Sequence, residues 1–163
     1  MNRCTEEQLR ASFVNVSQRE RKEITMPVGL DDLAWDRLDY LGWRDRKIPS
    51  LGYVVVELDD DLVGIQLRQA EGRLRSRAQC AWCEDVTLPN DVVAFNARRT
   101  GAAGRNGNTV GTLACSNFEC SANVRKLPPM AYIGFDAEAA REQRILDLRV
   151  HVGNFVRNVR DGS

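Results

Sequence analysis

The sequence predicts an α+β fold, in which antiparallel β-hairpins are flanked by N-terminal helices and a long C-terminal helix. Two observations lead to this prediction. Short runs rich in β-branched residues are separated by turn residues in the middle of the chain. Apolar residues at helical spacing stand near both ends. The length of 163 residues suits one domain with an appended helical segment, and a hydrophobic content of 43% is enough for a core.

Two helices are predicted in the N-terminal part. The first covers residues 5–24, because Thr5 and Gln8 match a capping box and apolar residues follow at helical spacing. The second is shorter, covers residues 32–41 and has Asp31 as its N-cap. Its large aromatic side chains are expected to pack in the core.

Two pairs of strands are predicted next. Residues 52–58 and 62–68 are rich in β-branched residues and read as a hairpin. Residues 92–98 and 109–114 form a second pair, separated by the glycine-rich segment 99–107. This segment lacks the pattern of a phosphate-binding P-loop. We therefore expect a mobile basic finger between the two strands.

A long helix is predicted at the C-terminal end. It begins after Asp136, a suitable N-cap, and runs to about residue 159. One face carries a stripe of apolar residues at helical spacing, which we expect to be buried. Its members are Ile145, Leu148, Val152, Phe155 and Val159.

Four cysteines in two close pairs are the most specific signal in the chain. Cys80-x2-Cys83 and Cys115-x4-Cys120 have the ligand type and spacing of a tetrahedral structural zinc site. A site with four protein ligands leaves no open position for chemistry, so the pattern favours a recognition module over a catalyst. Two disulfides, or redox catalysis by the first pair alone, are the weaker alternatives.

The order of elements around the cysteines matches a treble-clef arrangement. The first pair lies on a knuckle, 31 residues holding two strands and a loop follow, and the second pair stands at the start of a short helix over about 118–126. Thiolates at a helix N-terminus are favoured by exposed amides and the helix dipole. We expect an N-terminal helical segment over 1–29 and a zinc-binding domain over 30–163, with its treble-clef core at 73–127.

Charge is unevenly distributed although the whole chain has a formal net charge of zero. The segment 73–127 carries eight basic and four acidic residues, so its net charge is +4. A local basic face indicates an acidic partner surface or phosphate, although a solvated surface would carry the same charges. Arg98, Arg99 and Arg105 are candidates for contacts with carboxylate or phosphate groups. Trp82, expected to be exposed on the knuckle, is the further candidate.

Enzymatic and membrane functions have little support in the sequence. His151 is the only histidine, and no set of positioned nucleophilic or acid–base residues is recognisable. No small-molecule substrate is evident. No apolar run approaches the about 18 residues of a membrane helix, and no signal peptide is seen, so we expect a cytoplasmic protein with reduced thiols.

Four segments together resemble the FBP domain of bacterial elongation factor G-binding proteins, the FusB type of fusidic acid resistance proteins. The resemblance covers about residues 30–160, and the cysteines and the Gly/Arg loop are its specific part. The segments are Leu41–Asp45, Cys80–Cys83, Asn96–Thr112 and Cys115–Cys120.

The resemblance implies a treble-clef zinc protein that binds elongation factor G and modulates its release from the ribosome. It also implies Zn²⁺ as the cofactor, held by Cys80, Cys83, Cys115 and Cys120. Partner contacts are then expected at Trp82 and at the three loop arginines. The alternative hypothesis is direct binding of the ribosome or of RNA, with arginines on phosphates and Trp82 stacked on a base.

Overall fold

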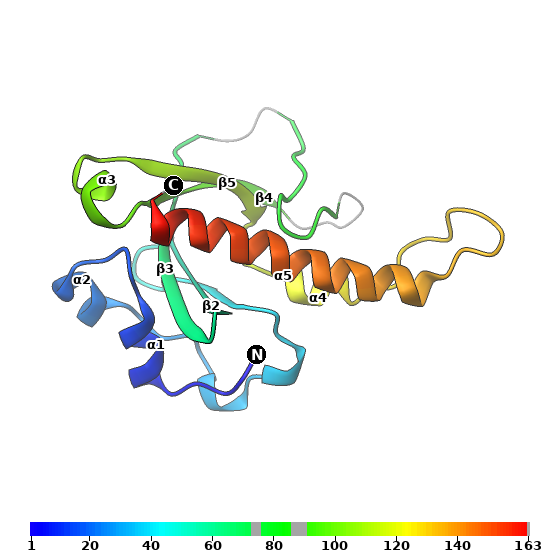
Figure 1. Ribbon diagram of the computed structural model, residues 1–163, viewed down its shortest axis with the longest axis horizontal. Coiled ribbons are helices and arrows are strands. Elements are labelled where there is room, and N and C mark those ends of the chain that lie inside the picture. Colours follow the sequence, from blue (N-terminus) through cyan, green and yellow to red (C-terminus); the bar gives the residue numbers. More distant parts are fainter. Residues whose placement is uncertain (73–75, 86–90, 163) are drawn as a thin grey trace.

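The computed structural model describes residues 1–72, 76–85 and 91–162, and it shows one antiparallel sheet with the long helix α5 along it (Figure 1). The sheet has five strands in the order β1-β2-β3-β4-β5. The predicted α+β architecture is thus confirmed. The elements are α1 (Glu6–Ser12), α2 (Gln18–Glu23), η1 (Leu30–Asp32), η2 (Trp35–Arg37), β1 (Leu41–Arg44), β2 (Leu51–Leu58), β3 (Asp61–Gln69), β4 (Val92–Arg98), α3 (Gly101–Arg105), β5 (Thr109–Cys115), α4 (Cys120–Val124) and α5 (Ala137–Asp161).

Both predicted hairpins are present in the sheet. In the first, Leu58 pairs with Asp61 across a two-residue turn. The turn residues Asp59 and Asp60 have φ of 53° and 67°, and positive φ at both positions is the pattern of the type I′ turns that suit the twist of a hairpin. In the second hairpin, β4 pairs with β5 along its whole length, from Val92 opposite Cys115 to the end near α3.

The segment between β4 and β5 is not the mobile finger expected from its glycines. It contains the short helix α3, and hydrogen bonds hold it against the last turns of α5. The Thr100 N–H donates to the Val159 carbonyl at 3.1 Å, and Arg99 Nη1 donates to the Asn158 carbonyl at 2.9 Å. Gly104 permits this packing, because a Cβ there would lie 1.7 Å from the backbone oxygen of Arg99.

The single helix predicted over residues 5–24 is wrong, because the chain forms two helices there. The first has the predicted Thr5–Gln8 capping box. A second capping box, between Ser17 and Glu20, starts α2. Between the helices the chain runs beside β3, where the Val14 N–H donates to the Gly64 carbonyl at 2.9 Å. This strand-like contact replaces the helical turns predicted from spacing alone.

The second predicted helix, over residues 32–41, is also wrong. The chain makes the two 3₁₀ turns η1 and η2 and then enters strand β1. Asp31 lies within η1 and does not cap a helix. Gly42 pairs with Val54 in the sheet, and a Cβ on Gly42 would lie 2.5 Å from Cβ of Phe118. A Cβ on Gly52 of β2 would lie 2.7 Å from Cζ of the same Phe118 side chain.

The sheet separates two hydrophobic cores. Val54, Val56 and Leu58 of β2 belong to the core shared with α5 and the cysteines. The alternate residues Tyr53 and Val55 belong to a second core, formed with the N-terminal segments. Because successive side chains of a strand point to opposite faces, the two cores lie on opposite sides of the sheet. The N-terminal segment 1–29 therefore packs on one face of the sheet, and the boundary at residue 29 stays a prediction.

The C-terminal helix α5 begins after Asp136, which accepts a hydrogen bond from the Ala139 N–H as the predicted N-cap. Leu148, Val152 and Val159 of the predicted stripe are buried, and Val156 joins them. Ile145 and Phe155 are partly buried against the same core. Within the described part of the chain, no helix combines the length and the apolar character needed to cross a membrane.

Candidate metal centre

The four cysteines come together at one point of the fold. Their sulfur atoms all lie within 4.8 Å of one another, and all four residues are buried. The Sγ–Sγ distances are 3.7 Å for Cys80–Cys120 and 3.7 Å for Cys83–Cys115, so these thiols are not disulfide-bonded. A tetrahedral zinc site with Zn–S bonds of about 2.3 Å has S–S edges of about 3.8 Å. The spacing therefore fits one tetrahedral ion.

Three elements bring these sulfurs together. The knuckle is tied to β5 by the Ala81 N–H, which donates to the Leu113 carbonyl at 2.8 Å. Cys115 is the last residue of β5, and Cys120 is the first residue of α4. Between them the chain turns sharply at Phe118, whose φ of 61° lies in the left-handed region. The predicted order of knuckle, hairpin and helix is confirmed.

Backbone and amide donors surround the sulfurs. The Trp82 N–H donates to Cys80 Sγ at 3.4 Å. The side-chain amide of Asn123 lies 3.6 Å from Cys115 Sγ and 3.9 Å from Cys83 Sγ. Such donors reduce the negative charge on thiolate ligands and fix their orientation. Sequence reasoning missed Asn123, although its position three residues after Cys120 on a helix places it on the same face.

The four thiols ionise as a coupled group. Hydrogen bonds from Cys115 and the other cysteines lower the pKa of Cys80. For Cys120 the effect is opposite: its hydrogen bond with Cys115, the largest cause, and those with Cys80 and Cys83 raise its pKa. The group therefore loses its first proton easily and holds its last one. A divalent cation at the centre provides the positive charge that stabilises all four thiolates together.

Trp82 is not exposed on the knuckle, and the expectation that it would be is wrong. Its side chain is 2% exposed and belongs to the core between the sheet and α5. The indole packs against the rings of Tyr40, Phe118 and Phe155, with centroid distances between 5.6 and 6.2 Å. Its backbone carbonyl lies 3.1 Å from Nδ1 of His151 on α5. Trp82 thus joins the knuckle to α5.

The three predicted loop arginines lie far from the cysteines. Arg98 pairs with Thr109 at the α3 end of the β4–β5 hairpin, whereas Cys115 pairs at the opposite end. Six residues of strand separate the two ends, which is about 20 Å. Arg98 also lies 3.4 Å from Glu20 of α2, and Arg105 is exposed on α3. The structure therefore does not bring the arginines and the metal centre into one site.

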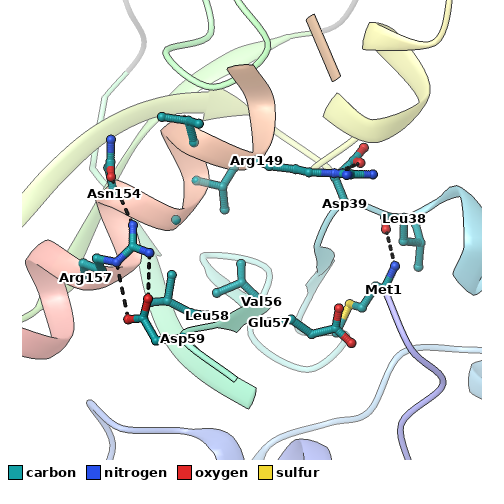
Figure 2. A pocket seen from close by; sticks show the side chains of 13 residues that line it. Met1, Leu38, Asp39, Val56, Glu57, Leu58, Asp59, Arg149, Asn154 and Arg157 are labelled. Atoms are coloured by element: carbon teal, nitrogen blue, oxygen red, sulfur yellow. Dashed lines mark hydrogen bonds and ion pairs between the residues drawn. The ribbon is translucent and has the colours of Figure 1, made fainter. Parts of the chain in front are cut away.

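A cavity of about 410 Å³ lies between α5, the end of the β2–β3 hairpin and residues 38–39 (Figure 2). Two ion pairs line it, Asp39 with Arg149 and Asp59 with Arg157, both with N–O distances of 2.9 Å. Hydrogen bonds from Arg157 lower the pKa of Asp59. A general acid at neutral pH needs a raised carboxyl pKa, so Asp59 is unsuited to that role.

Comparison with known proteins agrees with this geometry. The family model of the FBP C-terminal treble-clef zinc-finger matches residues 8–159. A solved structure of the fusidic acid resistance protein FusC superposes with a TM-score of 0.53 at 21% sequence identity. The superposition covers 76% of this chain and 52% of FusC, so the chain spans about half the length of that protein. At this identity the likeness shows the fold. No curated protein sequence matches the chain.

The family match covers almost the whole chain, including most of the N-terminal segment. A zinc-finger family and four clustered, buried thiols identify Zn²⁺ as the cofactor. The chain belongs to the family of the FBP C-terminal treble-clef zinc-finger.

Proposed function

We propose that this chain is a cytoplasmic, non-enzymatic binding protein that contacts elongation factor G and modulates its release from the ribosome. The observation that carries the proposal is the family match over residues 8–159, together with the closed cluster of four cysteines. The resemblance of the chain to elongation factor G-binding proteins supplies the partner. The similar structure, FusC, is a fusidic acid resistance protein.

The metal has a structural role in this proposal. Cys80, Cys83, Cys115 and Cys120 are the ligands, and with four thiolates the ion has no open position for a substrate. The ion would hold together three pieces of chain that are distant in the sequence, the knuckle, the end of β5 and the start of α4. Zinc binding then contributes directly to the free energy of folding.

The basic end of the β4–β5 hairpin is the proposed electrostatic contact. Arg98 and Arg105 are exposed there, whereas Arg99 is half-buried and donates to the Asn158 carbonyl. Complementary charge raises the association rate and the specificity more than the affinity. Trp82 is 2% exposed and is not part of this surface.

A binding titration of the zinc-loaded chain with elongation factor G tests the proposal. We expect binding that weakens with salt and with Arg98→Glu or Arg105→Glu, since both side chains are exposed. Arg3→Glu is the matched control, because Arg3 is an exposed arginine that pairs with Asp31, away from the β4–β5 hairpin. The same titration with ribosomal RNA tests the alternative partner. Absence of binding to the factor at micromolar concentration would overturn the proposal.

A further inference from the structure

The loop between α4 and α5 exposes large apolar side chains to solvent. Figure 1 shows this loop projecting from the body of the molecule, beyond the first turn of α5. The exposed fractions are 56% for Leu127, 78% for Met130, 66% for Tyr132 and 101% for Ile133. Single exposed apolar residues are normal on a protein surface, but a concentration of them on one projecting segment marks an interaction site.

The tip of this loop is a defined turn. The Phe135 N–H donates to the Tyr132 carbonyl at 3.1 Å, and Gly134 has φ of 88°. A four-residue turn with positive φ at its third residue is typical of type II. The rings of Tyr132 and Phe135 meet edge to face, with centroids 5.4 Å apart. The turn therefore holds Ile133 outward, at its second position.

The stem of the loop is also restricted. Pro128 and Pro129 have fixed φ angles, and they limit the conformations of the residue before each of them. An apolar side chain on a restricted turn loses little conformational entropy when it is buried by a partner. These features suit an anchor residue that enters a preformed pocket.

The charges around the loop argue against a lipid surface. Lys126 precedes the loop, whereas Asp136 and Glu138 follow it. Binding to anionic membranes depends on clusters of basic residues that are free to meet lipid headgroups. The arginines near the loop are paired with carboxylates instead: Arg125 with Asp39, Arg141 with Glu138 and Arg144 with Asp85. The loop thus has an apolar tip, and the net charge of the residues at its base is nearly zero.

The shape of the loop argues against a second copy of the chain. A specific interface buries about 800 Å² on each partner. Two projecting turns that meet tip to tip are both convex, so they would touch over only a small part of such an interface. A concave partner can enclose the tip and contact the adjacent surface of α5, where Leu146 and Val150 are also exposed.

We propose that the turn Tyr132–Phe135, together with Met130, is an apolar anchor that inserts into a concave apolar pocket of the protein partner. The inference rests on the proposed function only for the identity of that partner, elongation factor G. The anchor lies at the N-terminal end of α5. The basic end of the β4–β5 hairpin, with α3, lies against the C-terminal end of the same helix. The 25 residues of α5 separate them by about 37 Å, so a partner that contacts both would bind an extended surface.

The test is a calorimetric titration of elongation factor G with the full-length, zinc-loaded chain and with Ile133→Ser. We expect the variant to bind about tenfold more weakly or worse, as for an interface anchor, with unchanged zinc content and thermal midpoint. Val28→Ser is the matched control, because Val28 is 73% exposed in the N-terminal part and should bind like the wild type.

The outcomes separate the two proposals. Wild-type binding with no loss in Ile133→Ser or Tyr132→Ala would overturn the anchor and leave the proposed function standing. Absence of wild-type binding would overturn both. Binding of the wild type to vesicles with 30% anionic lipid, or self-association seen by light scattering, would assign another occupant if Ile133→Ser abolished it, and would also overturn the anchor.

Discussion

Replacing Trp82 by alanine removes a side chain that the sequence places on a surface and the structure places in the core. The indole is 2% exposed and contacts three aromatic rings from three separate segments of the chain. Removing a buried tryptophan costs about 3–5 kcal/mol. The aromatic contacts place Trp82 above the lower end of this range, because each pair adds about 0.5–1.5 kcal/mol beyond area burial.

The variant Trp82→Phe keeps an aromatic ring in the core but removes the five-membered ring with its Nε1–H group. Within the described residues Nε1 has no hydrogen-bond partner, so the phenylalanine variant gives up contact area and no hydrogen bond. We expect a loss of about 1–2 kcal/mol for Trp82→Phe and about 4 kcal/mol for Trp82→Ala. For a chain of this size the second value corresponds to a fall of about 10 °C in Tm.

The assay is urea unfolding of the zinc-loaded variants, followed by far-UV circular dichroism, with the metal content measured in parallel. A loss below about 1 kcal/mol in Trp82→Ala would refute the reasoning, since such a small effect is typical of an exposed residue. If that variant also lost partner binding at full stability, Trp82 would be a contact residue as the sequence suggested.

Four further predictions concern the metal, a buried carboxylate and two glycines. Chelation of zinc is expected to unfold the cysteine-bearing half together with the sheet packed on it, because metal binding in comparable small sites is worth about 10–16 kcal/mol; intact circular dichroism after complete removal would contradict this. Burial raises the pKa of Asp45, but hydrogen bonds from the Ile48 backbone and the Tyr53 hydroxyl outweigh it, and the pKa is lowered. The stability that Asp45 contributes is thus present above its unfolded pKa of about 3.9 and is lost as pH falls through the folded value. The difference between the urea midpoints of the wild type and Asp45→Asn should therefore be constant above about pH 5 and should shrink as pH falls below about pH 4. A difference that stays constant below about pH 3 would argue against this. Gly104→Ala should cost about 2 kcal/mol, because its Cβ would meet a backbone oxygen at 1.7 Å, and an unchanged Tm would contradict the close packing of α3. Gly153→Ala should stabilise α5 by about 0.5–1 kcal/mol, because its Cβ would make only ordinary contacts, the nearest at 3.5 Å; a lower Tm would show a hidden clash.

Elements with a local signal could be predicted from the sequence. The hairpin at Asp59 and Asp60 and the helix after Asp136 are fixed by turn and cap residues within a few positions. The break in the first helix was missed although its signal is local. Ser17 and Glu20 form a second capping box, and this outweighs the helical spacing of the apolar residues before it.

The surroundings of the metal site could not be predicted, because they depend on contacts between segments that are distant in the sequence. The metal site could be predicted from the four cysteines, because the short spacing within each pair is typical of two sulfur ligands on one zinc ion. The burial of Trp82 could not, since Tyr40, Phe118 and Phe155 come from three different parts of the chain. The same is true of the separation between Arg98 and Cys115, which depends on the register of β4 and β5.

The packing of Phe118 determines whether the metal module and the sheet unfold together or separately. Its ring lies where side chains of Gly42 and Gly52 would stand, so a residue of the metal module occupies the surface of strands β1 and β2. The position of Phe118 is set by the turn between Cys115 and Cys120. Release of the ion therefore removes a packed ring from the edge of the sheet. The metal module and the sheet form one cooperative unit, and fluorescence of Trp43 and Trp82 should report a single transition although they lie in different cores.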